Sequence, residues 1–499
     1  MSDSARTPVI VGVGQLNDRP ADPMVGLDTL GLMAAAARLA EADAGGGAWL
    51  AEIESIGVVD NLSFRELGDI VPLLAAELGA TPRIAYKTKY PSGASPILLL
   101  NEAAHRIANG EITSALIAGG EALRTAAQRT AMKSGDKESD HNAIRSIPQR
   151  REPTYAQRYG LIAPVDIYPL YENATRAAWG QSLADAQTES GEIWSRFSQV
   201  AAAHDGAWIR KPVSAEDVAR VSADNRPIAF PYTKLMVANS SVNQGAAFIV
   251  TSLAQALQRG IPEERLIYVG HGAAADESND ILARDRFDHS ASMAVSLQRT
   301  LDLNAIKSAE LDCVELYSCF PCVPKMARRI IDWPVEKPAT VFGGLTFGGG
   351  PIGNYMSHAV VAMTQNLRAG GQHGLLFANG GFATQNHSII ISRDPARAAV
   401  KPRDFDYQAE ADAQREPIPQ LIASYSGPAK VETYTVFYER DGRPRAGVVV
   451  GKTPADERFL AKIPATDENA ISYLTDGKAE PVGASGTAFA SGNETHWRF

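Results

Sequence analysis

The sequence predicts an α/β protein followed by a second, smaller all-β domain. Three observations support this prediction. Apolar runs of strand length alternate with longer helical patterns over most of the 499 residues, a stretch rich in proline, glutamine and charge begins after residue 392, and alternating strand patterns follow it. Strands that alternate with helices are typical of βαβ units and of largely parallel sheets.

The α/β region shows the same rhythm twice. In its first part, strands are predicted at residues 8–14, 53–59 and 114–118, and helices at 27–43 and 96–109. In its second part, strands are predicted at 266–270 and 311–316, and helices at 291–301 and 324–331. We therefore expect two halves of similar layout, residues 1–260 and 261–392.

The remaining chain divides into a linker and a tail. Residues 393–424 have the composition of a linker that wraps the surface. In residues 425–499, the strand pattern at 430–438 and the run at 445–450 flank Asp441-Gly442, a favoured hairpin turn. Helical periodicity is absent there, so we expect a small, separable all-β domain, barrel-like in form.

Composition and charge exclude several classes of function. The formal net charge is −9 and no Lys/Arg block is long enough to follow a phosphate backbone, so no nucleic-acid partner is expected. No apolar run approaches the roughly 20 residues of a membrane span, and no signal peptide is recognisable. Only three cysteines are present, which argues against a disulfide framework. These features predict a cytoplasmic protein without a membrane partner.

The first candidate site precedes the helix predicted at 96–109. Ser95 is a good N-cap, and Pro96 suits the first helical position because its missing N–H would be unbonded there anyway. Such a helix directs free N–H groups and partial positive charge at whatever lies before Gly93, which suits an oxyanion or a thioester carbonyl. Most helix caps have no chemical role, so a plain capped helix is the alternative.

The second candidate lies at the end of the strand predicted at 311–316. Tyr317 could act there as an acid or base. Cys319 and Cys322 form a CxxC spacing at a strand-to-helix turn, which could lower a thiol pKa. No other thioredoxin-like feature accompanies them and no zinc ligand set is present, so we expect buried structural cysteines and no metal.

Two glycine-rich segments complete the candidates. The segment 343–353 would allow close backbone approach to a ligand, although it does not fit the P-loop pattern. It is followed by His358, and the segment 378–382 is followed by His387. Either histidine could be a base, but a lone histidine is more often structural.

Five ordered segments resemble motifs of the thiolase superfamily over residues 7–392. They are VIVGVG at 9–14, like the first thiolase strand, AGGE at 118–121, like AGG-x-E, YSCF at 317–320, in place of NEAF, GGPIG at 349–353, in place of GHPxG, and ANGG at 378–381, in place of CxGG. The pattern is most similar to sterol-carrier-protein thiolases and to bacterial thiolase-like proteins of type 1, which PYTKLM at 231–236 and the β tail also resemble. The resemblance implies a duplicated five-layered αβαβα thiolase fold that handles CoA thioesters.

The departures from this pattern remove the thiolase chemistry. Gly93 stands where the acyl-carrying cysteine should be, and Gly350 and Tyr317 replace the GHP histidine and the NEAF asparagine. The second catalytic cysteine should lie near Ala378, yet no cysteine follows Cys322. A ping-pong cycle through an acyl-cysteine therefore cannot run.

The remaining groups suit a different reaction. Thiolase-like retro-aldolases of steroid side-chain breakdown resemble this arrangement, because they use a tyrosine in a YDCF-like motif and need no acyl-cysteine. They work with a separate OB-fold partner, and VETYTV at 431–436 looks like a strand of that domain, here fused as an OB-like tail. The catalytic candidates are Tyr317, His358 and His387. The oxyanion- or CoA-binding candidates are Gly93, Ser95, Gly350, Asn379 and Gly380.

Three functions follow from these residues. The leading hypothesis is an enzyme that breaks or forms a carbon–carbon bond in a CoA thioester, with coenzyme A as part of the substrate and no bound cofactor. The first alternative is a non-catalytic acyl-CoA-binding thiolase relic. The second is an atypical acyltransferase with Ser92 or Ser95 as nucleophile, although neither has a base close in sequence. Thiolases dimerise, so a homodimer is expected unless the tail covers that surface.

Overall fold

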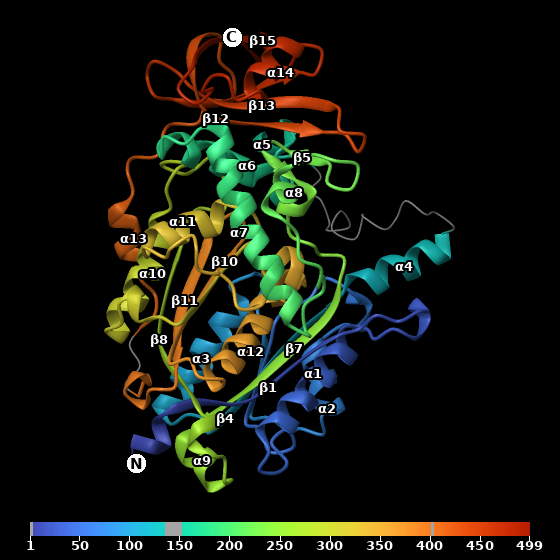
Figure 1. Cartoon of the computed structure of the whole chain (residues 1–499), viewed down its shortest axis with the longest axis vertical. Helices are drawn as coiled ribbons and strands as arrows, with labels where there is room; N and C mark the ends of the chain where they lie inside the picture. Colours follow the sequence, from blue (N-terminus) through green and yellow to red (C-terminus); the bar gives the residue numbers. More distant parts are fainter. Residues whose placement is uncertain (1–2, 135–151, 401–403) are drawn as a thin grey trace.

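The computed structural model describes residues 3–134, 152–400 and 404–499. Its centre is a nine-stranded sheet in the order β3-β2-β4-β7-β1-β8-β11-β10-β9 (Figure 1). The strands are β1 (Pro8–Asn17), β2 (Ser55–Val58), β3 (Ile84–Lys87), β4 (Ser114–Ala122), β7 (Asn243–Ser252), β8 (Ile267–Asp276), β9 (Cys313–Leu316), β10 (His373–Gly380) and β11 (Gln385–Ser392). Most of them are buried, as their continuous apolar runs predict.

The sheet consists of two related halves, as the sequence predicts. The order β1-β7-β4-β2-β3 in the first half is matched by β8-β11-β10-β9 in the second, and the halves meet where β1 pairs with β8. The expectation of largely parallel strands is wrong. Within the described part of this sheet, only β2–β3, β2–β4 and β9–β10 are parallel pairs. The strands β10 and β11 are joined by a short turn, and a short turn can join only antiparallel neighbours.

Helices form the other layers of the core. The helices α3 (Ser95–Asn109) and α12 (Tyr355–Arg368) contact strands of both halves and lie between them, whereas α1 (Thr29–Ala44) and α10 (Ala291–Asn304) cover the outer faces (Figure 1). This is the five-layered αβαβα arrangement that the sequence predicts. The other helices are α2 (Ile70–Glu77), α4 (Leu123–Ser134), α5 (Tyr155–Arg158), α6 (Pro164–Ala178), α7 (Leu183–Ala203), α8 (Ala215–Ala219), α9 (Leu253–Gln258), α11 (Cys322–Ile330) and α13 (Gln408–Gln414). No helix in the described ranges is long and apolar enough to cross a membrane.

The C-terminal domain is a closed, OB-like barrel in the order β12-β13-β14-β16-β15-β12. Its strands are β12 (Gly427–Tyr438), β13 (Pro444–Lys452), β14 (Arg458–Pro464), β15 (Ser485–Ser491) and β16 (Glu494–Arg498). The expectation that it lacks helices is wrong, because α14 (Glu468–Thr475) connects β14 to β15. Eight residues are too few for helical periodicity to stand out in the sequence.

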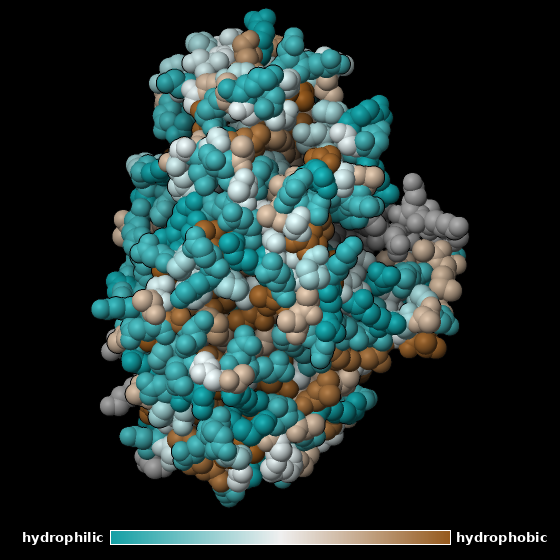
Figure 2. All heavy atoms as spheres, in the orientation of Figure 1, coloured by the Kyte–Doolittle hydropathy of each residue, from teal (hydrophilic) through white to brown (hydrophobic). Residues whose placement is uncertain are grey.

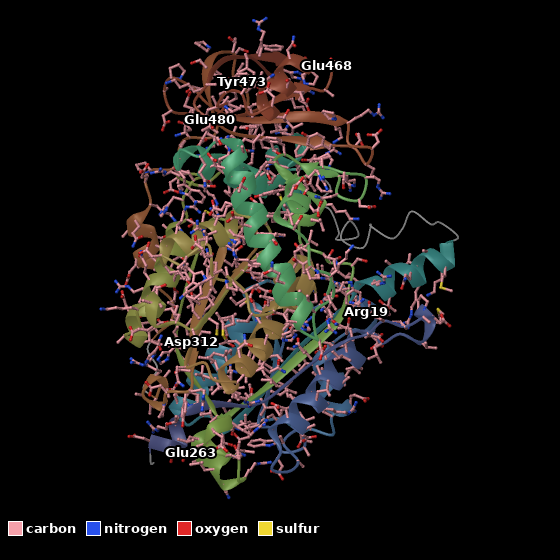
Figure 3. The ribbon with its side chains drawn as sticks, viewed as in Figure 1. Arg19, Glu263, Asp312, Glu468, Tyr473 and Glu480 are labelled. Atoms are coloured by element: carbon pink, nitrogen blue, oxygen red, sulfur yellow. The ribbon has the colours of Figure 1, made fainter. Side chains whose placement is uncertain are left out.

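The barrel packs tightly on the core. The core strands β5 (Pro227–Ala229) and β6 (Tyr232–Thr233) extend its sheet, since Ala229 pairs with Phe437. The Asn173 amide on α6 donates to the Tyr434 carbonyl at 2.9 Å. Four barrel side chains join the main hydrophobic cluster of the core: Phe437, Val448, Val450 and Leu460. Barrel and core accordingly share one continuous surface (Figure 2). Glu480, which lies at their boundary in Figure 3, forms an ion pair with Arg176 of the core.

Candidate functional site

The site is organised around the start of α3. The expectation that Ser95 is the N-cap is wrong, because the helix begins at Ser95 and its N-cap is Ala94. The Ser92 hydroxyl accepts a hydrogen bond from the Ala94 N–H at 3.2 Å and donates to Gln385 Oε1 at 2.5 Å. Ser95 Oγ accepts from the Ser92 N–H at 3.2 Å. Both serines therefore shape the turn before the helix.

Tyr317 fills the space beside Gly93. A Cβ built at Gly93 would overlap the Tyr317 hydroxyl and the Asn379 carbonyl oxygen, and would lie 2.5 Å from Tyr317 Cζ. The tyrosine is only 6% exposed, and burial, followed by the neighbouring Cys319 thiol, raises its pKa well above 10. The phenol is thus a neutral proton donor at physiological pH, and it occupies the place of a side chain at position 93.

Asn379 and Gly380 form the opposite wall of the site. The Asn379 amide accepts from the Tyr168 hydroxyl at 3.1 Å and donates to Asn386 Oδ1 at 2.8 Å. A Cβ at Gly380 would overlap Ser92 Oγ, so this position requires glycine for close approach to the start of α3. The structure therefore brings Tyr317 and Gly93 together with Asn379 and Gly380.

Gly350 does not offer a free backbone N–H to a ligand. Its N–H donates to the Asn239 carbonyl at 2.8 Å, so this donor is already used within the protein. Its neighbour Gly353 packs directly on the turn before α3, where a Cβ would lie 2.9 Å from the Ser92 nitrogen. Between them, Ile352 has a φ of 44°, a left-handed conformation that a β-branched residue adopts only at a cost of about 1–3 kcal/mol. The loop therefore packs against the turn before α3 and supports it.

The two candidate histidines lie apart from Tyr317. His358 Nδ1 is 2.7 Å from Gln15 Oε1, and its ring stacks on Phe342 at 5.2 Å. His387 Nε2 is 2.9 Å from the Asn101 amide nitrogen. Neither contacts Tyr317 in the described structure. Burial lowers the pKa of each to about 3, so both are neutral at physiological pH and weak as bases.

These histidines predict a loss of stability in acid. Between pH 6.5 and 3 the unfolded chain binds their protons and the folded chain does not, so each contributes stability that is present above pH 6.5 and lost as the pH falls. When the pH is lowered from 7 to 5, the free energy of unfolding should fall in both proteins. The fall should be about 2 kcal/mol smaller in His387→Asn than in the wild type. Urea unfolding at both pH values measures this difference. An equal fall in both proteins would show that His387 is protonated within the fold.

The cysteines of the CxxC spacing are not activated. Burial raises the pKa of Cys319 to about 12 and that of Cys322 well above its ordinary value. The possibility that the strand-to-helix turn lowers a thiol pKa is therefore wrong, because loss of hydration outweighs the helix dipole in so deeply buried a position. All three cysteines are free.

Three further residues border the site, and two of them, Glu315 and Tyr168, had no role predicted from the sequence. Tyr355 packs edge-on against Tyr317 at 5.9 Å and donates from its hydroxyl to Glu315 Oε1 at 2.8 Å. Burial raises the pKa of Glu315 to about 7. Tyr168, on α6, stacks on Phe320 at 4.5 Å. Glu315 adjoins the Tyr317 motif in the sequence and could have been considered, whereas Tyr168 lies in no recognisable motif.

Restoring a cysteine at position 93 is expected to destabilise the protein. Its Cβ would meet the Asn379 backbone and the Tyr317 ring, neither of which can move freely, so Gly93→Cys should lower the free energy of unfolding by roughly 3 kcal/mol. Gly350→Cys is the matched control and should cost less, because its Cβ would make a tight contact at 3.2 Å rather than an overlap. Urea denaturation compares the two variants. A Gly93→Cys protein as stable as wild type would contradict the packing of Tyr317 against position 93.

The comparisons with known proteins agree with this fold. A family model described as the thiolase-like protein type 1 additional C-terminal domain matches residues 408–493. The crystal structure of a monomeric SCP2-thiolase like protein type 1 from Mycobacterium smegmatis is 31% identical, with 100% of both chains covered and a TM-score of 0.84. No curated protein matches the chain.

More distant structures share the fold alone. Human mitochondrial 3-ketoacyl-CoA thiolase in complex with CoA is 14% identical over 78% of this chain and 98% of its own, with a TM-score of 0.57. The Ltp2-ChsH2(DUF35) aldolase is 15% identical over 78% of this chain and 99% of its own, with a TM-score of 0.58. The molecule is thus a thiolase-fold protein. Within that class, the chain belongs to the SCP2-thiolase-like protein type 1 family.

Proposed function

We propose that this protein acts on CoA thioesters by breaking or forming a carbon–carbon bond without an acyl-enzyme. The observation that carries the proposal is the Tyr317 phenol, which lies against Gly93 where a nucleophilic side chain would otherwise stand. It places a proton donor at the start of α3, beside the partial positive charge of the helix. The N–H groups of Ser92, Ala94 and Ser95 are bonded within the turn. An enolate that develops on a thioester there would therefore be stabilised chiefly by the partial positive charge at the start of α3.

The reaction needs only one proton-transfer group. In the cleavage direction, the β-hydroxyl of a hydroxyacyl-CoA loses its proton as the bond between Cα and Cβ breaks. A carbonyl product and a thioester enolate result. The Tyr317 phenol gives its proton to Cα while its oxygen accepts the proton of the β-hydroxyl, so the phenol releases one proton and takes up one in the same exchange. Its raised pKa keeps the phenol protonated at neutral pH, so a proton is present for the transfer. His358 and His387 are not needed for this balance.

A non-catalytic acyl-CoA-binding protein is the second candidate. It is favoured by the burial of the site, since Tyr317 and the Asn379 side chain are 6% and 0% exposed. The atypical acyltransferase gains no support, because Ser92 donates to Gln385 and Ser95 Oγ contacts only backbone groups in the described structure. Cytoplasmic location, coenzyme A as part of the substrate and the homodimer implied by thiolases stay predictions.

Binding of CoA thioesters is the first test of the proposal. A ligand that binds only the folded state at a hundredfold excess over its Kd should stabilise it by about 2.7 kcal/mol, seen as a higher melting temperature. We expect this shift with a β-hydroxy-β-branched acyl-CoA, and also expect that substrate to be cleaved. Acetoacetyl-CoA should not be thiolysed. Stabilisation without cleavage would favour the binding protein, and no shift with any acyl-CoA would refute both functions.

A further inference from the structure

The loop that follows Gly380 is strained and held from several sides. It joins β10 to β11, and Ala383 within it has a φ of 56°, a conformation that costs a non-glycine residue about 1–3 kcal/mol. The Tyr168 hydroxyl accepts from the Ala383 N–H at 2.8 Å, and the Tyr171 hydroxyl donates to the Phe382 carbonyl at 3.0 Å. A strained loop keeps such a conformation only while its neighbours impose it.

Arg284 is the charged residue that holds the loop after Gly380. Its side chain is buried, donates to the carbonyl oxygens of Ala383 at 2.6 Å and Phe382 at 3.1 Å, and lies 4.7 Å over the Tyr171 ring. Residues 282–285, to which it belongs, form no helix or strand. The position of Arg284 therefore depends on what holds this segment in place.

Arg458 of the barrel holds the segment. Its guanidinium is fully buried and donates to the carbonyl oxygens of Leu282 at 2.7 Å, Asp285 at 3.1 Å and Arg284 itself. It also pairs with the Glu432 carboxylate at 2.5 Å. An arginine suits this place because its planar group offers five N–H donors in a fixed arrangement, whereas a lysine offers a single point charge.

We propose that Arg458 is a positioning residue through which the barrel fixes the loop after Gly380, by way of the 282–285 segment and Arg284. The barrel thus helps to place the wall of the site formed by Asn379 and Gly380. This gives the additional domain a role in the reaction that rests on the proposed function, although the mechanical link can be tested without any substrate.

Hydrogen exchange of the free protein tests the link. In Arg458→Met, the amides of Ala383 and Thr384 should exchange about tenfold faster or more, while those of β4 change little, as expected for local rather than global opening. Arg443→Met is the matched control, since Arg443 lies in the same barrel but forms an exposed pair with Asp441. It should leave both regions unchanged. Equal acceleration in β4 and at Ala383, or none at Ala383, would overturn the proposal.

Two further variants keep the test decisive. If Arg458→Met does not fold, Arg458→Lys retains the charge and should still speed exchange at Ala383. The three donors of one ammonium nitrogen cannot serve the three carbonyls and the Glu432 carboxylate together. Arg284→Met should speed the same amides, and the double variant should add little to either single change. Additive effects would show that the two arginines act separately. If wild type binds no acyl-CoA, the proposed function fails while this exchange pattern still decides the link.

Discussion

Replacing Tyr317 by phenylalanine is expected to reduce turnover of a β-hydroxyacyl-CoA by roughly a hundredfold or more, the usual effect of losing a positioned proton-transfer group. The change removes one hydroxyl and retains the ring, which keeps its edge-on contact with Tyr355. The free energy of unfolding should therefore change by no more than about 1–2 kcal/mol. Steady-state kinetics and urea unfolding on the same preparation measure both quantities.

Tyr355→Phe is the matched control for this prediction. It removes the other phenol of the pair, whose hydroxyl donates to the buried Glu315 carboxyl. That change should cost stability, because Glu315 loses a hydrogen bond in a buried position, and should affect turnover much less. Near-normal turnover in Tyr317→Phe would remove Tyr317 from the chemistry. The remaining candidates for the proton-transfer group would then be Tyr355, His358 and His387.

Deleting residues 425–499 is expected to make the rest of the chain aggregate. The sequence suggests a separable tail, but Phe437, Val448 and Leu460 of the barrel belong to the main hydrophobic cluster of the core. Their removal would expose an apolar face to water, and large exposed apolar patches promote association. The buried Asn173 amide would also lose its partner on Tyr434. Light scattering and far-UV circular dichroism of the truncated protein measure the outcome.

Supplying the missing domain is the control for the truncation. Co-expression of residues 425–499 as a separate chain should restore solubility if the loss comes from the exposed interface. A truncated protein that stays monomeric and folded without this partner would show that the interface contributes little. In that case, the barrel would be the separable unit that its composition suggests.

The sequence predicted the fold better than the site. Short motifs located Tyr317 and Gly93 separately, but their contact joins residues far apart in the chain and depends on how β9 and α3 pack. The capping role assigned to Ser95 failed because Ser92, three residues earlier, bonds the Ala94 N–H. Local preference cannot decide which of two serines three residues apart bonds the N–H groups at the start of a helix.

Other parts of the site had no local signal. Tyr168 reaches Asn379 from α6, a helix whose sequence carries no motif of the family. His358 and His387 looked equally suited to catalysis, and only the structure shows that their ring nitrogens contact Gln15 and Asn101. Burial is a property of the packed chain and cannot be deduced from one residue and its neighbours in sequence.

The mutual packing of Gly93 and Tyr317 also constrains how this lineage can change. A cysteine at 93 collides with the tyrosine ring, and a smaller residue at 317 leaves a cavity beside a glycine that cannot act as a nucleophile. Each substitution therefore costs stability before the other is made. The two positions are epistatic, and a change from glycine to cysteine at position 93 would have to pass through a less stable intermediate.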